Sequence, residues 1–373
     1  MRTSSLLVGL SLLFTTGCAG GVKLTPIKTG FGKPSNVAVY FRVEDGKEPI
    51  GGLTADSFHI YEDDGLVSQF ESKQTINNPE VAASHYTLLL VDLSGSVAES
   101  GAMQTLIDAA NTFVDRVEKQ HKVAVYGFDG AEGLHPIAPF TSAGGAKGGL
   151  KALGSYKPQD PSTNLNGAIV KGLAELDDGL AHAEHPMRFG TLVIFSDGTD
   201  RAHRVPEEDM YKAIDGTKHD VFAIGLGPEL SEAQLKKVGK AGTARADNKE
   251  DVVKAFDAIA QRIEARTKSY YLLSYCSPSR AGKHKVKIEA VVKNDKGEKK
   301  GSLVQDFDAQ GFAQGCDPKT PPSFDITKGD ALAPKDDKKD DKKVEAGGKV
   351  EVKAPSVKVQ GGASGGGQEQ FNP

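Results

Sequence analysis

The stretch YTLLLVDLSGSVAES, residues 86–100, decides the fold class of this chain. Residues 88–91 are all apolar and the run ends at Asp92, as expected of a parallel strand that is covered on both faces. Ser94 and Ser96 follow Asp92 at a spacing of two residues. Because ligands bind an open α/β sheet beyond the carboxyl ends of its strands, we predict a central strand that ends in a binding loop.

Strand and helix patterns alternate between residues 85 and 268. Apolar strand runs recur at residues 122–128, 191–197 and 220–227. Apolar side chains recur at helical spacing in residues 102–120, 167–180 and 252–266. This alternation predicts an α/β fold, with a doubly wound, mostly parallel sheet and helices on both of its faces.

Shorter strand patterns flank this region on both sides. Before it, within residues 36–84, strands are predicted at 37–43, 58–63 and 67–76. After it, within residues 269–316, strands are predicted at 269–275, 284–292 and 301–307. Because a small sheet alone buries too little apolar surface, we expect both sets to form one β-sandwich with the α/β domain inserted in it. Two separate β appendages are the alternative.

The first residues have the features of an export signal. Arg2 precedes a short apolar run at residues 6–14, which fits a secretory signal and is too short to span a bilayer. Gly17-Cys18 resembles the lipobox of bacterial lipoproteins, which implies cleavage of residues 1–17 and attachment of lipid to Cys18. Ala19 stands where an inner-membrane retention signal usually has Asp, which points to the outer membrane. A plain signal peptide with an incidental cysteine is the alternative.

Both ends of the remaining chain are predicted to lack a core. Residues 18–35 are rich in Gly, Lys and Thr without an apolar period, which favours a tether. Residues 317–373 are rich in Pro, Lys, Asp and Gly, a composition that predicts a disordered tail. The lysines of residues 335–343 are interleaved with aspartates, so we expect a solvated spacer there.

Cys276 and Cys316 are the two cysteines that remain besides Cys18. Exported proteins meet an oxidising environment, in which we predict that these two form a disulfide. Such a bridge closes a loop of about 40 residues and stabilises the fold by about 4 kcal/mol in the chain-entropy model. Two free thiols are the alternative.

Composition and motifs narrow the class of function. Lys and Arg total 46 against 50 Asp and Glu, a net charge of −4, which gives no reason to expect a nucleic-acid partner. The sequence lacks a G-x-x-x-x-G-K-[ST] phosphate loop and an H-E-x-x-H zinc motif, and no nucleophile elbow lies near Ser94 or Ser96. We therefore expect a protein that is not an enzyme.

Three separated segments offer oxygen donors at the predicted carboxyl edge of the sheet. Asp92, Ser94 and Ser96 follow one strand, Asp197 ends another, and Thr163 lies just before a helix. Hydroxyls and carboxylates suit Mg²⁺, Ca²⁺ or Mn²⁺ rather than Zn²⁺ or copper. Such a shell leaves one position for a carboxylate from outside. Alternatively, Asp92 caps local backbone amides, and Ser94 and Ser96 are turn residues.

Residues 85–268, half of the chain, resemble a von Willebrand factor type A (VWA) domain. Asp92-Leu93-Ser94-Gly95-Ser96 matches the D-x-S-x-S motif of that family, and Thr163 and Asp197-Gly198 match its later threonine and aspartate. Further similarity lies in VYGFDG (125–130), PFT (139–141) and VFAIGLG (221–227). The resemblance implies a metal-ion-dependent adhesion site (MIDAS). Ser94 and Ser96 would bind the metal directly, Thr163 in the ligand-competent form, and Asp92 and Asp197 directly or through water.

The function expected from these features is that of a binding and adhesion module anchored in the bacterial cell envelope. Its cofactor would be Mg²⁺, with Ca²⁺ or Mn²⁺ possible, and its partner a protein that offers an acidic side chain. The protein would be attached to the outer membrane through the lipid on Cys18. The alternative is a structural envelope lipoprotein whose domain is a metal-independent scaffold.

Overall fold

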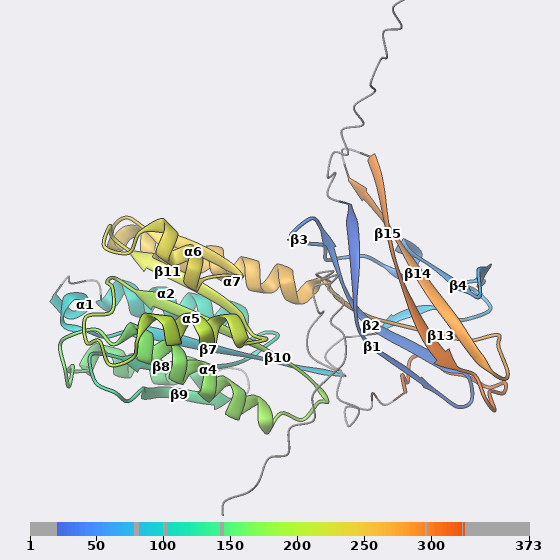
Figure 1. Ribbon diagram of the computed structural model, residues 1–373, viewed down its shortest axis with the longest axis horizontal. Coiled ribbons are helices and arrows are strands. Elements are labelled where there is room, and N and C mark those ends of the chain that lie inside the picture. The colour runs from blue at the N-terminus through green and yellow to red at the C-terminus, as the bar shows by residue number, and fades with distance from the viewer. Residues whose placement is uncertain are drawn as a thin grey trace, which may run out of the picture. The chain divides into compact units, whose positions relative to one another are not determined.

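A computed structural model describes residues 21–77, 82–99, 101, 103–141, 145–294, 297–322 and 324 of the chain (Figure 1). The predicted signal segment, the predicted lipidation site Cys18 and the tail from residue 325 lie outside these residues. Within the described part, no helix has the length and apolar character needed to cross a membrane.

A six-stranded sheet forms the centre of the α/β region, with strand order β12-β11-β10-β7-β8-β9. Its strands are β7 (Ala83–Asp92), β8 (Lys122–Phe128), β9 (His135–Thr141), β10 (Met187–Ser196), β11 (Asp220–Leu226) and β12 (Gly242–Ala246). All neighbours run parallel except β9, which is antiparallel to β8. The mostly parallel sheet is confirmed, whereas its two edge strands, β9 and β12, were not predicted.

Helices cover both faces of this sheet (Figure 1). They are α1 (Gly95–Glu99), α2 (Met103–Val117), α3 (Gly145–Leu150), α4 (Leu165–Ala181), α5 (Glu207–Gly216), α6 (Glu232–Val238) and α7 (Val252–Lys268). Leu89 and Val91 of β7 pack in one apolar cluster with α2 and α7, whereas Leu88 and Leu90 pack in another with α4. Successive residues of β7 thus face opposite layers, which explains why the strand is apolar throughout.

The flanking strands form a β-sandwich of two sheets. One sheet holds β1 (Val22–Gly32), β2 (Asn36–Asp45), β3 (Glu48–Pro49), β6 (Thr75–Asn77) and β13 (Tyr270–Cys276), and the other holds β4 (Phe58–Glu62), β5 (Gly65–Leu66), β14 (Lys283–Asn294) and β15 (Gly297–Asp308). In each sheet a strand from before the α/β region pairs with one from after it: β2 with β13, and β4 with β14. Phe41 and Phe58, from opposite sheets, meet edge to face at 5.5 Å in a shared core. The joint sandwich is confirmed, and two separate appendages are ruled out.

Three predicted segments differ from the structure. The predicted tether at residues 18–35 contains β1, which pairs with β2 and buries Val22 and Leu24. The predicted strand at 67–76 is mostly loop, since only β6 belongs to a sheet there. The predicted tail starts with ordered residues, because the Asn36 amide donates to the carbonyls of Asp317 and Thr320 at 2.8 Å each. In each case tertiary contacts, which a local pattern does not report, decide the outcome.

The predicted disulfide is confirmed. Cys276 at the end of β13 is bonded to Cys316, with a Cα–Cα distance of 5.7 Å across 40 residues of sequence. The bridge therefore fixes the chain that follows β15 to the end of β13.

Candidate metal centre

Adjacent strands bring two of the predicted donors to one edge of the sheet. β7 and β10 are parallel neighbours whose pairing reaches Val91 and Phe195, so Asp92 and Ser196 follow at the same level. The Ser196 hydroxyl donates to Asp92 Oδ2 at 2.6 Å, and its oxygen also lies 2.9 Å from the carbonyl oxygen of Gly198. Asp197, the next residue, therefore leaves β10 beside the carboxylate that ends β7.

Hydrogen bonds link the loop after β7 to Asp197. Asp92 Oδ1 accepts from the backbone N–H of Ser94 at 3.0 Å. The hydroxyl oxygens of Ser94 and Ser96 lie 3.2 Å apart, and Ser96 Oγ donates to Asp197 Oδ1 at 3.0 Å. Asp92, Ser94, Ser96 and Asp197 thus form one continuous group of oxygen atoms, although 101 residues separate Ser96 from Asp197.

The loop that carries Thr163 is held between the other two loops by backbone hydrogen bonds. The carbonyl of Thr163 accepts from the N–H groups of Arg201 and Ala202 at 2.8 and 2.9 Å. On the other side, the N–H of Gly95 donates to the carbonyl of Pro161 at 2.9 Å. A Cβ at Gly95 would lie 3.2 Å from that carbonyl oxygen, so a glycine permits this close approach. All five predicted residues therefore lie at one edge of the sheet.

The two carboxylates of the group are in unfavourable surroundings for a negative charge. Asp92 is 0% exposed, and burial raises its pKa to about 7, although hydrogen bonds from Ser196 and Ser94 oppose the rise. Burial also raises the pKa of Asp197 against the hydrogen bond from Ser96. Arg201 lies close enough to oppose the rise at Asp197 but is paired with Glu229 at 2.7 Å. A bound cation would favour the ionised form of both aspartates.

The chemistry of this donor set fits a hard divalent cation. Asp92 and Asp197 supply carboxylates, and Ser94, Ser96 and Thr163 supply hydroxyls. Among the described residues, no cluster of three or more His, Cys, Asp or Glu side chains is placed to hold a metal ion. A divalent cation at the candidate centre would be held by hydroxyl oxygens as well as by carboxylates.

Two further residues of the site were not predicted from the sequence. Ser196 lies within a predicted strand, and its role depends on the register between β7 and β10. Asp129 follows β8, is buried, and accepts hydrogen bonds from Tyr156 and Gln159 of the segment that leads to Thr163. Asp129 belongs to the VYGFDG segment, whose similarity to VWA domains could have drawn attention to it. Its hydrogen-bond donors, however, lie about 30 positions later in the sequence, so the local pattern does not predict them.

Several solved structures are similar to this chain. One is a von Willebrand factor type A protein from Catenulispora acidiphila, with 10% identity over 80% of this chain and 75% of that chain at a TM-score of 0.42. Another is proximal thread matrix protein 1 from the mussel byssus with a zinc-occupied MIDAS motif, with 16% identity over 48% of each chain at a TM-score of 0.40. A third is the manganese-loaded TRAP protein of Plasmodium vivax, with 10% identity over 68% of this chain and 99% of that chain at a TM-score of 0.40.

The chain spans about half the length of the mussel protein. No protein-family model matches the chain, and no curated protein matches it.

Proposed function

We propose that residues 85–268 form a VWA-type binding module that captures an acidic side chain of a protein ligand through a divalent cation. The observation that carries this proposal is the 3.0 Å contact from Ser96 Oγ to Asp197 Oδ1, between two loops far apart in sequence. Beside it lies the second carboxylate, Asp92, fully buried and bonded to Ser196. Such a group of hydroxyl and carboxylate oxygens is what Mg²⁺ binds in proteins, with Ca²⁺ or Mn²⁺ as alternatives.

Each residue has a defined role in this proposal. Ser94, Ser96 and Thr163 would hold the ion through their hydroxyls, and Asp92 and Asp197 directly or through water. The bound ion supplies the positive charge that attracts a carboxylate from the ligand. No step of bond making or breaking is needed, so the proposed role is that of a binding protein and not of an enzyme.

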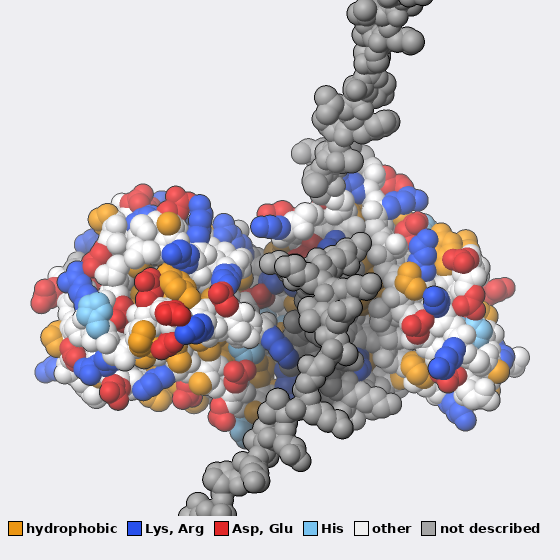
Figure 2. All heavy atoms as spheres, viewed as in Figure 1, with side chains coloured by type: hydrophobic (Ala, Val, Ile, Leu, Met, Phe, Trp, Pro, Cys, Tyr) orange, Lys and Arg blue, Asp and Glu red, His pale blue; other side chains and the backbone are white. Residues whose placement is uncertain are grey.

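The surface charge is compatible with a protein partner. On the face shown in Figure 2, the coloured Lys and Arg side chains intermingle with Asp and Glu, and neither sign forms a continuous field. An electrostatic surface for nucleic acid would have a basic stripe. We therefore propose recognition through one coordinated carboxylate and its immediate neighbours rather than through a charged surface.

Attachment to the envelope is proposed through lipid on Cys18, in the outer membrane. Because β1 begins at Val22, the chain between the lipidated residue and the first strand is short. Residues 19–21 lie between them, and the four steps along the chain from Cys18 to Val22 span at most about 14 Å when fully extended. The β-sandwich would therefore be held close to the bilayer surface, unlike the longer tether expected from the sequence.

Metal binding by the purified full chain tests the proposal. We expect saturable Mg²⁺ binding by calorimetry, at least about tenfold weaker in Ser96→Ala and in Asp197→Asn. Asp247→Asn is a matched control, since Asp247 follows β12 at the same edge of the sheet and is 84% exposed. Capture of an envelope protein should then require Mg²⁺ and be lost with EDTA and in Ser96→Ala.

A metal-independent scaffold predicts a different outcome. Partner capture would then be the same with Mg²⁺, with EDTA and in both variants. Such a result, with wild-type protein shown to be folded by circular dichroism, would contradict the proposed function.

A further inference from the structure

Resting on the function proposed above, we propose that Asp129 is a positioning residue for the metal ligand Thr163. In this proposal the turn at residues 129–131 is the platform on which the loop at residues 156–164 is docked. Asp129 would not touch the ion. It would act by fixing the place from which Thr163 presents its hydroxyl group.

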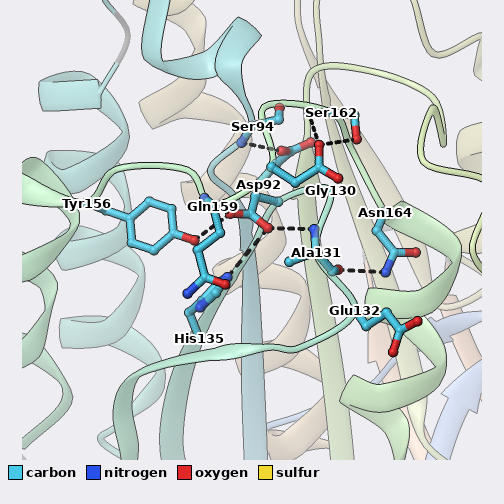
Figure 3. A network of polar contacts seen from close by, with 12 residues as sticks. Asp92, Ser94, Gly130, Ala131, Glu132, His135, Tyr156, Gln159, Ser162 and Asn164 are labelled. Carbon is cyan, nitrogen blue, oxygen red and sulfur yellow. Dashed lines mark hydrogen bonds and ion pairs between the residues drawn. The ribbon is translucent and has the colours of Figure 1, made fainter.

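The Asp129 carboxylate is buried and saturated with donors. It is 0% exposed. Oδ1 accepts from the N–H of Ala131 at 2.8 Å, and Oδ2 accepts from the Tyr156 hydroxyl and from the N–H of Gln159 at 2.7 Å each. His135 Nε2 lies 3.5 Å from Oδ1. In Figure 3, dashed lines from Tyr156, the backbone of Gln159, Ala131 and His135 converge on one carboxylate.

Further hydrogen bonds dock the same loop on the backbone of the turn. The N–H of Gly130 donates to the carbonyl of Asp160 at 3.0 Å. Asn164, the neighbour of Thr163, donates through its N–H to the carbonyl of Asp129 and through its side chain to the carbonyl of Ala131, at 2.9 Å each. The platform therefore holds the loop both before Thr163 and directly after it.

The fit between turn and loop leaves no room for a side chain at Gly130. An ideal Cβ there would lie 2.1 Å from Ser162 Oγ and 2.5 Å from the Asp160 carboxyl group. Arg204, in the loop after β10, contacts both the turn and the Thr163 loop: it donates to the carbonyl of Gly130 and pairs with Asp160 at 2.8 Å. The turn, the Thr163 loop and the loop after β10 are thus packed as one unit.

The loop needs such a platform because it has no regular structure of its own. Residues 156–164 form neither helix nor strand before α4 begins at Leu165. A carboxylate is well suited to hold it, since an ionised acceptor forms shorter and stronger hydrogen bonds than a neutral one. Burial alone would raise the pKa of Asp129, but the bonds from Tyr156, Ala131 and Gln159 outweigh burial and lower it. The group is therefore ionised at neutral pH.

Asparagine at position 129 would disrupt these hydrogen bonds, because its amide nitrogen donates where the Asp129 carboxylate only accepts. We expect Asp129→Asn to weaken binding of Mn²⁺ alone to the full chain by about tenfold or more, the size of effect seen for outer-shell partners of metal ligands. Tyr156→Phe removes one of the hydrogen bonds and little volume, and it should weaken binding less but in the same direction. Asp247→Asn, an exposed charge removal at the same edge, should leave affinity unchanged.

A double-mutant cycle with Thr163→Ala separates positioning from a general structural effect. If Asp129 acts through Thr163, then Asp129→Asn adds nothing to the loss already caused by Thr163→Ala. Thermal unfolding of each variant with EDTA shows whether the fold is retained. If Asp129→Asn does not fold, Tyr156→Phe in the same cycle decides.

The possible failures are distinguishable. No Mn²⁺ binding by wild-type protein would overturn the proposed function, and the role of Asp129 with it. Mn²⁺ binding that weakens in Thr163→Ala but not in folded Asp129→Asn would overturn only the role of Asp129. If the losses of affinity caused by Asp129→Asn and Thr163→Ala add fully in the double variant, the role of Asp129 is overturned as well, because Asp129 would then act independently of Thr163.

Discussion

We predict that two buried histidines, His85 and His121, make the stability of this protein depend on pH. His85 in β7 lies with its ring centroid 5.1 Å from that of His121 and stacks on Phe189 at 5.0 Å. Burial lowers the pKa of His85 from 6.5 to about 4 and lowers that of His121 well below its usual value. His121 is fixed in its neutral form between the hydroxyls of Thr87 and Thr267, at 2.7 and 2.8 Å.

The sign and size of the effect follow from proton linkage. Between the two pKa values of His85 the unfolded chain binds a proton and the folded protein does not, so stability rises with pH across this window. The contribution of His85 to stability is complete above its pKa in the unfolded chain. It is lost as the pH falls toward its pKa in the folded protein. From about pH 7.5 to about pH 5 it falls by about 2 kcal/mol for His85 alone, a large part of the net stability of a typical domain.

Comparison with His85→Phe isolates this contribution, since a phenyl ring keeps the stacking and cannot titrate. We would measure urea unfolding of both proteins by circular dichroism with EDTA, in steps between these two pH values. The stability difference between wild type and variant should shift by about 2 kcal/mol, with wild type losing more on acidification. Parallel stability curves for the two proteins would refute the assignment of a buried neutral His85.

Other predictions concern the candidate centre and the disulfide. Ser196→Ala removes the 2.6 Å donor to Asp92 and should lower the unfolding free energy with EDTA by about 1–3 kcal/mol, measured by urea unfolding with Ser302→Ala as the exposed control. Because burial raises the pKa of Asp92 to about 7, Mg²⁺ binding should weaken as pH falls below that value and should release protons, which calorimetry in buffers of different ionisation enthalpy detects. Binding independent of pH there would argue against Asp92 as a group that must ionise. Replacing Cys276 and Cys316 together by Ser should cost about 4 kcal/mol in the chain-entropy model, and an unchanged midpoint of unfolding would contradict a stabilising bridge.

The central sheet was predictable because its inner strands are covered on both faces. β7, β10 and β11 read as apolar runs, and α2, α4 and α7 carry apolar residues at helical spacing. Edge strands carry a weaker signal. β9 contains Pro136 and Pro139, which are tolerated at a sheet edge and conceal a strand pattern. β12 is short and β1 is rich in Lys and Thr, so neither has an apolar run to detect.

The candidate site was predictable where its residues are close in sequence or match a separated motif. Asp92, Ser94 and Ser96 lie within five residues where β7 ends and α1 begins, Thr163 lies just before α4, and Asp197 follows β10. Ser196 and Asp129 were not predicted, because their roles arise only when two loops or two strands meet. The sequence around Asp129 does not indicate that Tyr156 and Gln159 donate hydrogen bonds to it.

Direct location of the ion tests the central claim. A crystal of the protein grown with Mn²⁺ should give an anomalous peak among the hydroxyls of Ser94 and Ser96 and the carboxylates of Asp92 and Asp197, at the edge of the sheet where Thr163 lies. A peak elsewhere, or none at saturating Mn²⁺, would contradict the account.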